Sequence, residues 1–456
     1  MDLQGVKVAV LGLGASGEAA ARLAVEQGGD VYVSDTRTDD AVAARGADLR
    51  ALGIDVELGG HDLERLAHAG LVVTSPGIPS DAPVLRSLAD RGKRWISEPE
   101  LAARFYTGSL IAITGTNGKT TTTLLVDHLL RASGIDSAAG GNVGGGMAPP
   151  ASELARRDPQ PRWVVLEMSS YQLGAVETFR PDIGVVTNLS PDHQDRYGSV
   201  EAYYADKARI FDNADDASVW VLPAGDVAVR ELAGDAPGRR FYFGRDAGDA
   251  FVDQGVMTLR HMGEIEPLIP LEDYPLLGAH NVLNGLAAAL VARLAGAAEG
   301  GLAAGLGSAK ALPHRLEPVA EVDGVLWVND SKATNLAATR SALASLDRPV
   351  VLLLGGKDKG EDFGELAEVA RGRVRAVATY GAAGERAARE LEEALGGGSP
   401  TVVRVEGTLE DVVAQASRMA VAGDVVLLSP ACSSFDMYEN YERRGEHFAR
   451  LARSLA

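Results

Sequence analysis

A short apolar run that ends at a glycine-rich turn constrains this chain more than any other feature. Leu110–Ile113 has the composition of a buried strand, Thr114–Thr121 contains two glycines followed by a lysine and threonines, and apolar residues then recur at helical spacing from Leu124. A strand, a tight loop and a helix in this order direct the loop N–H groups and the positive end of the helix dipole at one point. Such a point binds phosphate.

The turn therefore predicts a nucleoside triphosphate site. Lys119 would lie along the β- and γ-phosphates, and a threonine hydroxyl after it would reach Mg²⁺. The usual P-loop has a glycine five positions before Gly118, where this chain has Ile113, so an ordinary strand-to-helix turn is the alternative. The residues expected to bind ATP here are Gly115, Thr116, Asn117, Gly118, Lys119, Thr120 and Thr121.

Length and composition limit the class of protein. A chain of 456 residues predicts two to three domains, and 46% hydrophobic with 23% charged residues is typical of a globular protein. No apolar run approaches the roughly 20 residues of a membrane span, and the N-terminus lacks a signal-peptide pattern. The single cysteine, Cys432, excludes a disulfide framework and predicts a reducing cytoplasm. A net charge of −19 argues against non-specific nucleic-acid binding, but not against phosphate ligands.

A second glycine-rich turn lies near the N-terminus. The strand Lys7–Leu11 is followed by Gly12–Gly17, and the next strand ends at Asp35. This is the dinucleotide fingerprint, which holds NAD, FAD, another diphosphate or nothing. A further strand, Leu71–Thr74, ends in the turn Ser75–Pro79, and ligands of open α/β sheets bind at such ends.

Polar residues also follow the strands of the middle of the chain. Glu167 ends the strand that begins at Trp163 and is placed to hold Mg²⁺, or to cap a helix. His193 lies between acids in a loop, where a metal or substrate contact competes with a structural role. Lys207, on a helix capped by Ser199, reads from the pattern alone as a solvated lysine.

The last part of the chain again alternates strands and helices, which predicts a parallel sheet. Three of its strands end in polar stretches: Asn329–Asn335, Gly355–Gly360 and Ser429–Asp436. The whole is an α/β protein of three domains, with a Rossmann-like N-terminal domain (1–107), a central P-loop ATPase-like domain on a parallel sheet (108–311) and a Rossmann-like C-terminal domain (312–456). The P-loop domain has an α/β domain on each side, and each of these has strands that end in polar residues. This arrangement favours an ATP-driven reaction that joins two bound substrates.

The ordered set of motifs resembles the Mur ligases, the cytoplasmic amino-acid ligases of peptidoglycan synthesis. The resemblance covers essentially the whole chain, and Ile113 fits the family form of the loop. Asp330–Asn335 and Ser429–Asp436 are similar to the members that join D-glutamate to UDP-N-acetylmuramoyl-L-alanine. The motifs that carry the resemblance are Thr114–Thr120, Glu167–Ser170, Asp192-His193, Lys207, His280-Asn281, His314-Arg315 and Asp330–Asn335.

The resemblance implies a mechanism and its residues. The L-alanine carboxylate attacks the γ-phosphate of ATP, and the amine of D-glutamate then attacks the acyl phosphate. Lys119, His193 and a carbamylated Lys207 would be catalytic, and Mg²⁺ would lie at Thr120, Glu167, His193 and Lys207. Asn284, Arg315 and Asp330 would join the loop in binding ATP. The UDP-sugar would bind Gly14, Ala15, Ser16, Asp35, Thr36, Ser75, Gly77, Asn142 and Ser169, and D-glutamate would bind Lys332, Thr334, Lys359, Ser434, Phe435 and Tyr441.

The implied partners are these small molecules alone, and the protein is expected to act as a monomer without nucleic acid or membrane. Three other hypotheses stay open. A sister ligase or a folate polyglutamylating relative would use another acceptor. An NAD-dependent dehydrogenase would use Gly12–Gly17 and Asp35, but leaves the P-loop unexplained. A P-loop switch protein would carry an N-K-x-D motif to read guanine, which this sequence lacks.

Overall fold

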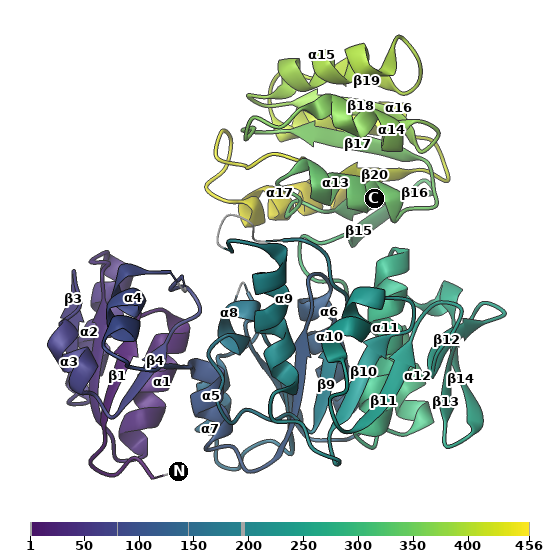
Figure 1. The fold of residues 1–456 in the computed structure, drawn as a ribbon. Coiled ribbons are helices and arrows are strands. Elements are labelled where there is room, and N and C mark those ends of the chain that lie inside the picture. The colour runs from purple at the N-terminus through teal and green to yellow at the C-terminus, as the bar shows by residue number, and fades with distance from the viewer. Residues whose placement is uncertain (1, 80, 145, 193–196, 456) are drawn as a thin grey trace. The chain divides into compact units, whose positions relative to one another are not determined.

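The structure is a computed structural model, and it describes residues 2–79, 81–144, 146–192 and 197–455. The chain divides into two compact units (Figure 1). The first runs from the N-terminus to Asp273 and includes Leu283–Gly307, and the second comprises Tyr274–Val282 and Ser308–Ala456. Each unit is described by itself below.

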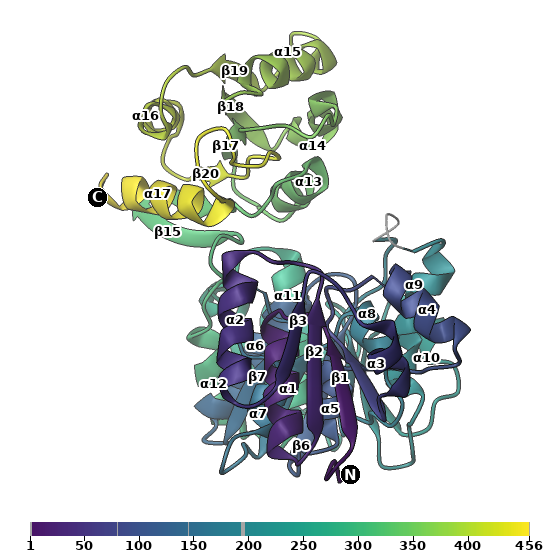
Figure 2. The same cartoon turned by 90° about the vertical axis from the view of Figure 1, so that its left-hand side faces the viewer.

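The first unit begins with a five-stranded parallel sheet of order β3-β2-β1-β4-β5. Apolar side chains of α1 and α2 pack on one face and those of α3 and α4 on the other (Figure 2). The strand order reverses between β1 and β4, where open α/β sheets bind ligands. The elements are β1 (Lys7–Leu11), α1 (Ala15–Glu26), β2 (Asp30–Asp35), α2 (Asp40–Ala51), β3 (Asp55–Leu58), α3 (Leu63–His68), β4 (Leu71–Thr74), α4 (Pro83–Asp90), β5 (Ile96–Ser97) and α5 (Glu98–Ala103).

The second sheet of this unit has nine strands in the order β14-β13-β12-β11-β10-β9-β6-β8-β7. β6 lies between β8 and β9, so the P-loop leaves the middle of the parallel part. The strands are β6 (Ser109–Thr114), β7 (Ser137–Gly141), β8 (Trp163–Glu167), β9 (Ile183–Val186), β10 (Val219–Pro223), β11 (Arg239–Phe243), β12 (Ala250–Asp253), β13 (Val256–His261) and β14 (Glu264–Pro270). The helices are α6 (Lys119–Ala132), α7 (Ala151–Ala155), α8 (Ser170–Leu173), α9 (Val200–Ala208), α10 (Val227–Ala233), α11 (Ala279–Leu294) and α12 (Glu299–Gly307).

The second unit contains a six-stranded sheet of order β15-β16-β20-β17-β18-β19. Helices α13 to α15 pack on one face and α16 and α17 on the other (Figure 2). Its elements are β15 (Glu317–Val322), β16 (Val325–Asn329), α13 (Leu336–Ala344), β17 (Val350–Gly355), α14 (Ala367–Ala370), β18 (Val374–Tyr380), α15 (Gly384–Leu395), β19 (Thr401–Arg404), α16 (Leu409–Met419), β20 (Val425–Leu428) and α17 (Tyr441–Arg453).

The predicted α/β architecture with three sheets is confirmed, with two corrections. The third sheet is not wholly parallel, because β15 pairs antiparallel with β16. The central sheet is extended by an antiparallel meander of β12, β13 and β14 that the sequence did not predict. Among the described residues, no helix combines the length and apolar character needed to span a membrane.

Candidate active site

The P-loop joins β6 to α6 through two glycines with positive φ. Gly115 has φ +135°, and a Cβ there would lie 2.0 Å from Thr187 Oγ1. Gly118 is the N-cap of α6 with φ +83°, and a Cβ there would lie 2.4 Å from Asn284 Oδ1. Backbone conformation and space both demand glycine at these positions. The structure thus confirms the strand, loop and helix that the sequence predicted, and brings Asn284 against the loop.

Lys119 and Thr120 open α6 with their side chains in polar contacts. Lys119 Nζ donates hydrogen bonds to the carbonyl oxygens of Gly115 and Thr116, at 3.1 and 2.8 Å. Thr120 Oγ1 donates to Glu167 Oε2 at 2.7 Å, and Asn142 Nδ2 donates to the other carboxylate oxygen at 3.2 Å. A hydroxyl and a carboxylate in contact are oxygen ligands of the kind that Mg²⁺ prefers.

Lys207 is the largest departure from what its sequence context indicates. Only 1% of the residue is exposed, and its Nζ donates to the carbonyl oxygen of Gly115 at 2.7 Å. The ring of Tyr203 lies beside the amine, with its centroid 4.6 Å away. Burial lowers the pKa of Lys207 to about 7, and the charge of Lys119 acts in the same direction. The carboxylates of Asp192 and Glu167 oppose the shift.

The loop after β9 is hydrogen-bonded to the P-loop. Thr116 Oγ1 donates to the carbonyl oxygen of Ser190 and accepts from its N–H, both at 3.0 Å. Asn188 bonds the backbone of Asn117 through both ends of its amide. His193 was predicted as a catalytic and metal-binding residue, but it lies outside the described residues. Within the described part of the chain, no group of three or more His, Cys, Asp or Glu side chains could hold a metal.

The N-terminal turn has the crowded backbone that its glycines predict. A Cβ at Gly17 would lie 1.8 Å from the carbonyl oxygen of Gly12. Ser75 Oγ donates to the same carbonyl at 3.0 Å and so joins the end of β4 to the turn after β1. Gly14 is the N-cap of α1, which begins at Ala15 and contains Ser16, whereas Gly77 has open space where a Cβ would stand.

Asp35 closes β2 beside this turn. Its Oδ2 accepts the N–H of Leu13 at 2.7 Å, and Arg37 donates to both carboxylate oxygens. Burial alone would raise the pKa of Asp35, but these hydrogen bonds outweigh it and its pKa is lowered. The ionised carboxylate of Asp35 therefore stabilises the turn by its hydrogen bond from the Leu13 N–H. The neighbouring Thr36 is exposed.

Two further residues expected to bind the UDP-sugar lie near Glu167. Asn142 donates to the Glu167 carboxylate, as described above, and its N–H donates to the Glu167 carbonyl at 2.9 Å. Ser169 is the N-cap of α8 in a capping box with Gln172. A hydroxyl used in a capping box has a structural role of its own.

In the second unit, Asp330 follows β16 and is 7% exposed. Its carboxylate accepts from Ser429 Oγ at 2.8 Å and from the N–H of Leu316 at 3.2 Å. Burial raises the pKa of Asp330 to about 7 in spite of these bonds and the charge of Arg315. The backbone beside the exposed Arg315 is strained, because His314 and Leu316 both have positive φ.

The residues expected to bind D-glutamate lie on three loops of the second unit, except Tyr441, which is the first residue of α17. Lys359 Nζ donates to Thr334 Oγ1 at 3.4 Å, which links two of the loops. Lys332 Nζ lies 5.7 Å from the centre of the Tyr441 ring. Ser434 is buried, and Phe435 beside it is 68% exposed.

Sequence reasoning missed Arg444. It is 1% exposed, its Nε donates to Ser331 Oγ at 3.0 Å, and its Nη2 donates to the carbonyls of Ser331 and Cys432. A Cβ at Gly356 would lie 3.1 Å from its Nη1. One guanidinium therefore lies beneath all three loops. Like many surface arginines, Arg444 lies on a helix with other charged residues. The one signal in the sequence is that Arg444 is the fourth residue of the helix that follows Ser429–Asp436.

Comparisons with known proteins match this arrangement throughout the chain. Residues 6–97 match the Mur ligase MurD-like N-terminal domain, 113–292 the Mur ligase middle domain, and 314–432 the Mur ligase glutamate ligase domain. UDP-N-acetylmuramoylalanine–D-glutamate ligase of Acidobacterium capsulatum is 44% identical over 456 residues, with 99% of this chain and 97% of that protein covered. The chain belongs to the Mur ligase family.

Other Mur ligases agree with this assignment. The enzymes of the same name from Salinibacter ruber and Myxococcus xanthus are each 42% identical, over 100% of this chain and 99% and 100% of theirs. Among solved structures, the UDP-N-acetylmuramate–alanine ligase MurC of Thermotoga maritima has a TM-score of 0.59 at 20% identity, over 99% of this chain and 100% of that one. MurF of the same organism, in complex with ADP, has a TM-score of 0.58 at 17% identity, over 100% and 96%. These two likenesses establish the shared fold.

Proposed function

We propose that the chain is an ATP-dependent ligase that joins D-glutamate to UDP-N-acetylmuramoyl-L-alanine. The L-alanine carboxylate attacks the γ-phosphorus of ATP, ADP leaves, and an acyl phosphate forms. The amine of D-glutamate attacks the acyl carbon, loses a proton and expels phosphate, which leaves an amide bond. The relatives' names supply the substrates, and the P-loop bonded to Glu167 through Thr120 is the observation that carries the chemistry.

The chain's own residues have defined tasks in this scheme. The N–H groups of the P-loop and the start of α6 bind the phosphates of ATP, and Lys119 neutralises charge on the transferred group. Catalysis of this kind consists of positioning and electrostatic stabilisation, since no enzyme nucleophile takes part. Asn284, Arg315 and Asp330 complete the proposed ATP set.

The oxygen ligands fit Mg²⁺, which we propose as the cofactor. Thr120 and Glu167 would hold it, with His193 and a carbamylated Lys207. When bound, Mg²⁺ would neutralise charge on the phosphate oxygens. Two observations support carbamylation: Lys207 is buried beside the loop, and its lowered pKa leaves part of the amine neutral near pH 7. A neutral amine adds to carbon dioxide, loses a proton and becomes a carbamate.

We assign the remaining residues by domain. Residues 1–107 would hold the UDP-sugar, 108–311 the ATP, and 312–456 the D-glutamate. The cations of Lys332 and Lys359, with the hydroxyls of Thr334 and Ser434, suit a dicarboxylate. We also propose that the enzyme acts as a monomer in the cytoplasm.

Phosphate release from ATP tests the reaction. The enzyme is incubated with ATP, Mg²⁺, UDP-N-acetylmuramoyl-L-alanine and one amino acid at a time. Release that depends on D-glutamate is expected. Release with L-lysine, meso-diaminopimelate or L-glutamate instead would keep the ligase and refute the acceptor, while no release with any amino acid would refute the reaction. Isotopically labelled bicarbonate, followed by carbon NMR, tests the carbamate on Lys207 separately.

A further inference from the structure

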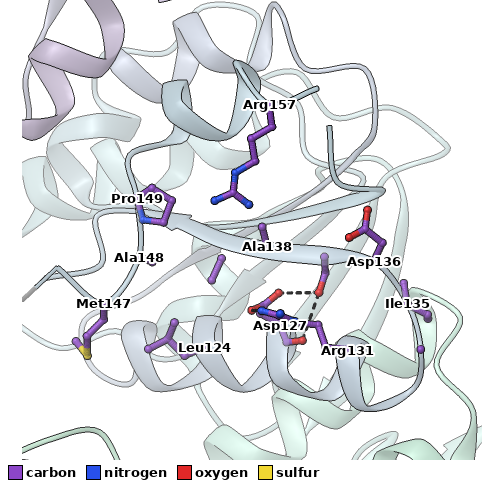
Figure 3. A pocket seen from close by; sticks show the side chains of 13 residues that line it. Leu124, Asp127, Arg131, Ile135, Asp136, Ala138, Met147, Ala148, Pro149 and Arg157 are labelled. Carbon is purple, nitrogen blue, oxygen red and sulfur yellow. Dashed lines mark hydrogen bonds and ion pairs between the residues drawn. The ribbon is translucent and has the colours of Figure 1, made fainter. Parts of the chain in front are cut away.

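Figure 3 shows a pocket of about 550 Å³ beside β7 in the first unit. Its charged lining consists of two acids and two arginines, Asp127, Asp136, Arg131 and Arg157. Charges of both signs in equal number select no class of ligand, so this pocket carries no assignment. The second unit contains a different arrangement, in which one arginine contacts the chain on both sides of a residue of the proposed D-glutamate set.

That arginine is Arg386, on α15. Its Nη2 donates a hydrogen bond to the carbonyl oxygen of Glu361 at 2.9 Å and lies 3.3 Å from Asp358 Oδ1. Lys359 lies between these two residues in the sequence. The guanidinium also lies over the ring of Phe363, with its central carbon 5.0 Å from the ring centre. Because Phe363 is buried and packs in the core, Arg386 holds this stretch of chain against a fixed surface.

The carboxylate of Asp358 is next to Lys359 in the sequence but is engaged by other groups. Its Oδ1 accepts the N–H of Gly360 at 2.9 Å and pairs with Arg386. Lys359 Nζ donates instead to Thr334 Oγ1 at 3.4 Å. A carboxylate this close to an ammonium group attracts it unless another cation neutralises the carboxylate. Arg386 supplies that cation.

Glu361 joins the same stretch of chain to the loop that contains Thr334. Its carbonyl oxygen accepts from Arg386, and its Oε2 accepts the N–H of Leu336, the first residue of α13, at 3.3 Å. Thr334 lies two residues before Leu336. Arg386 therefore fixes, directly and through Glu361, the two segments whose Lys359 and Thr334 side chains meet.

We propose that Arg386 is a positioning residue for the acceptor amino acid. By neutralising Asp358 and holding Glu361, it leaves the ammonium group of Lys359 available to a carboxylate of D-glutamate. Without Arg386, the carboxylate of Asp358 would compete with that substrate carboxylate for Lys359. The inference rests on the proposed function, which assigns Lys359 and Thr334 to D-glutamate. Arg386 belongs to none of the proposed binding sets and acts through Asp358 and Glu361.

Steady-state phosphate release by the full-length enzyme tests this role. Arg386→Gln should raise the KM for D-glutamate by roughly tenfold and leave the KM values for ATP and UDP-N-acetylmuramoyl-L-alanine unchanged. The side chain of Arg386 is 31% exposed, so the variant is expected to fold. The matched control is Arg389→Gln on the same helix. Arg389 lies 3.9 Å from Glu390, which also lies 3.7 Å from Arg386, and its loss should change none of the three KM values.

A second substitution separates positioning from a purely structural role. Asp358→Asn removes the carboxylate that would capture Lys359, while the amide oxygen can still accept the N–H of Gly360. The double variant Arg386→Gln/Asp358→Asn should therefore recover most of the lost affinity for D-glutamate. An unchanged KM for D-glutamate in Arg386→Gln, or an equal rise for all three substrates, would overturn the proposal. So would a double variant whose KM for D-glutamate is no lower than that of Arg386→Gln.

Hydrogen exchange distinguishes failure of this inference from failure of the proposed function. Wild-type enzyme that releases no phosphate with D-glutamate would refute the proposed function. Exchange of the Gly360 and Leu336 amides, followed by mass spectrometry, then tests Arg386 by itself. Both amides should exchange faster in Arg386→Gln, whereas the Ser433 amide, bonded to the Lys357 carbonyl at 3.0 Å, should be unaltered. Unchanged exchange at Gly360 and Leu336 would overturn the positioning role.

Discussion

Lys207 Nζ donates a hydrogen bond of 2.7 Å to the carbonyl oxygen of Gly115, the carbonyl that also accepts from Lys119 at 3.1 Å. A lysine from α9 and a lysine from α6 therefore converge on one backbone atom of the P-loop. Both cations in one buried place would repel each other, and the lowered pKa of Lys207 relieves that repulsion. The convergence gives Lys207 a role at the phosphate site that its helix position did not suggest.

Replacing this lysine tests that role. Lys207→Met keeps the length and the apolar contacts with Tyr203 but removes the amine. We expect phosphate release to fall by roughly a hundredfold, by analogy with the loss of one preorganised electrostatic group. The thermal midpoint should change little, because no buried charge is left unpaired. Lys7→Met, at an exposed position of β1, is the control. Retention of more than half of the activity in Lys207→Met would contradict the assignment.

The crowding at Gly118 yields a second prediction. Gly118→Ala places a methyl group 2.4 Å from Asn284 Oδ1 at a φ of +83°. The matched control is Gly134→Ala, at φ +74° with no atom within 4 Å of the new Cβ. Backbone strain alone should cost about 1 kcal/mol in either variant.

The two variants should therefore differ only through the clash. We expect about 1–3 kcal/mol of additional destabilisation in Gly118→Ala, as for overpacking. Its affinity for ATP should also fall by at least roughly tenfold, whereas Gly134→Ala should bind ATP normally. Thermal melting and ATP titration measure the two effects. Equal behaviour of the two variants would show that Asn284 moves aside.

Local pattern decided which parts could be predicted. The P-loop and the strands β1 and β4 follow from apolar runs that end at glycine or polar residues, and the structure has β1 and β4 at the predicted bounds. β15 was missed because Pro318 lies inside the run Glu317–Val322, and a proline within a run argues against a strand; its pairing with β16 is antiparallel. The meander β12 to β14 was also missed. Its strands are joined by hairpin turns at Gly255 and Gly263 and therefore do not alternate with helices.

Burial of charged residues was beyond local pattern. Lys207 and Arg444 are each 1% exposed, yet each lies on a helix with other charged residues. Tertiary packing decides which helix face is covered, and a lysine or arginine gives no apolar signal of it. For Lys207, only the family resemblance pointed to function.

Arg444 provides a third prediction. Arg444→Lys keeps the positive charge but cannot bond both Ser331 and Cys432 in the geometry of a guanidinium. The three loops should lose their common support, so the KM for D-glutamate should rise by roughly tenfold with a smaller change in the KM for ATP. Arg444→Leu leaves the carbonyls without donors and should destabilise the protein by about 2–4 kcal/mol.

Its neighbour supplies the control. Arg443 is exposed and pairs with Glu446 at 3.0 Å, so Arg443→Lys should leave both KM values and the thermal midpoint unchanged. A purely structural role for Arg444 would lower the melting temperature of Arg444→Lys and leave the ratio of the two KM values as in the wild type. That outcome would refute the positioning role.

Glu98, at the start of α5, provides a prediction on pH. It is 1% exposed, accepts the N–H of Ser152 in α7, and its Oε2 has no hydrogen-bond partner among the described residues. Burial raises the pKa of Glu98 from 4.5 to about 7. A raised pKa means that the folded state binds the proton more tightly, so stability is fully present below the unfolded pKa and is lost as the pH rises through the folded pKa.

Glu98→Gln should remove this dependence, because an amide replaces the neutral acid without titrating. At pH 4 the variant and the wild type should have similar thermal midpoints, whereas at pH 8 the variant should be more stable by up to about 3 kcal/mol. Asp330 titrates in the same range, but it is present in both proteins and cancels in the difference. Glu153→Gln, exposed on α7, should follow the wild type. A stability difference between Glu98→Gln and the wild type that is the same at both pH values would show that Glu98 does not become harder to ionise on folding.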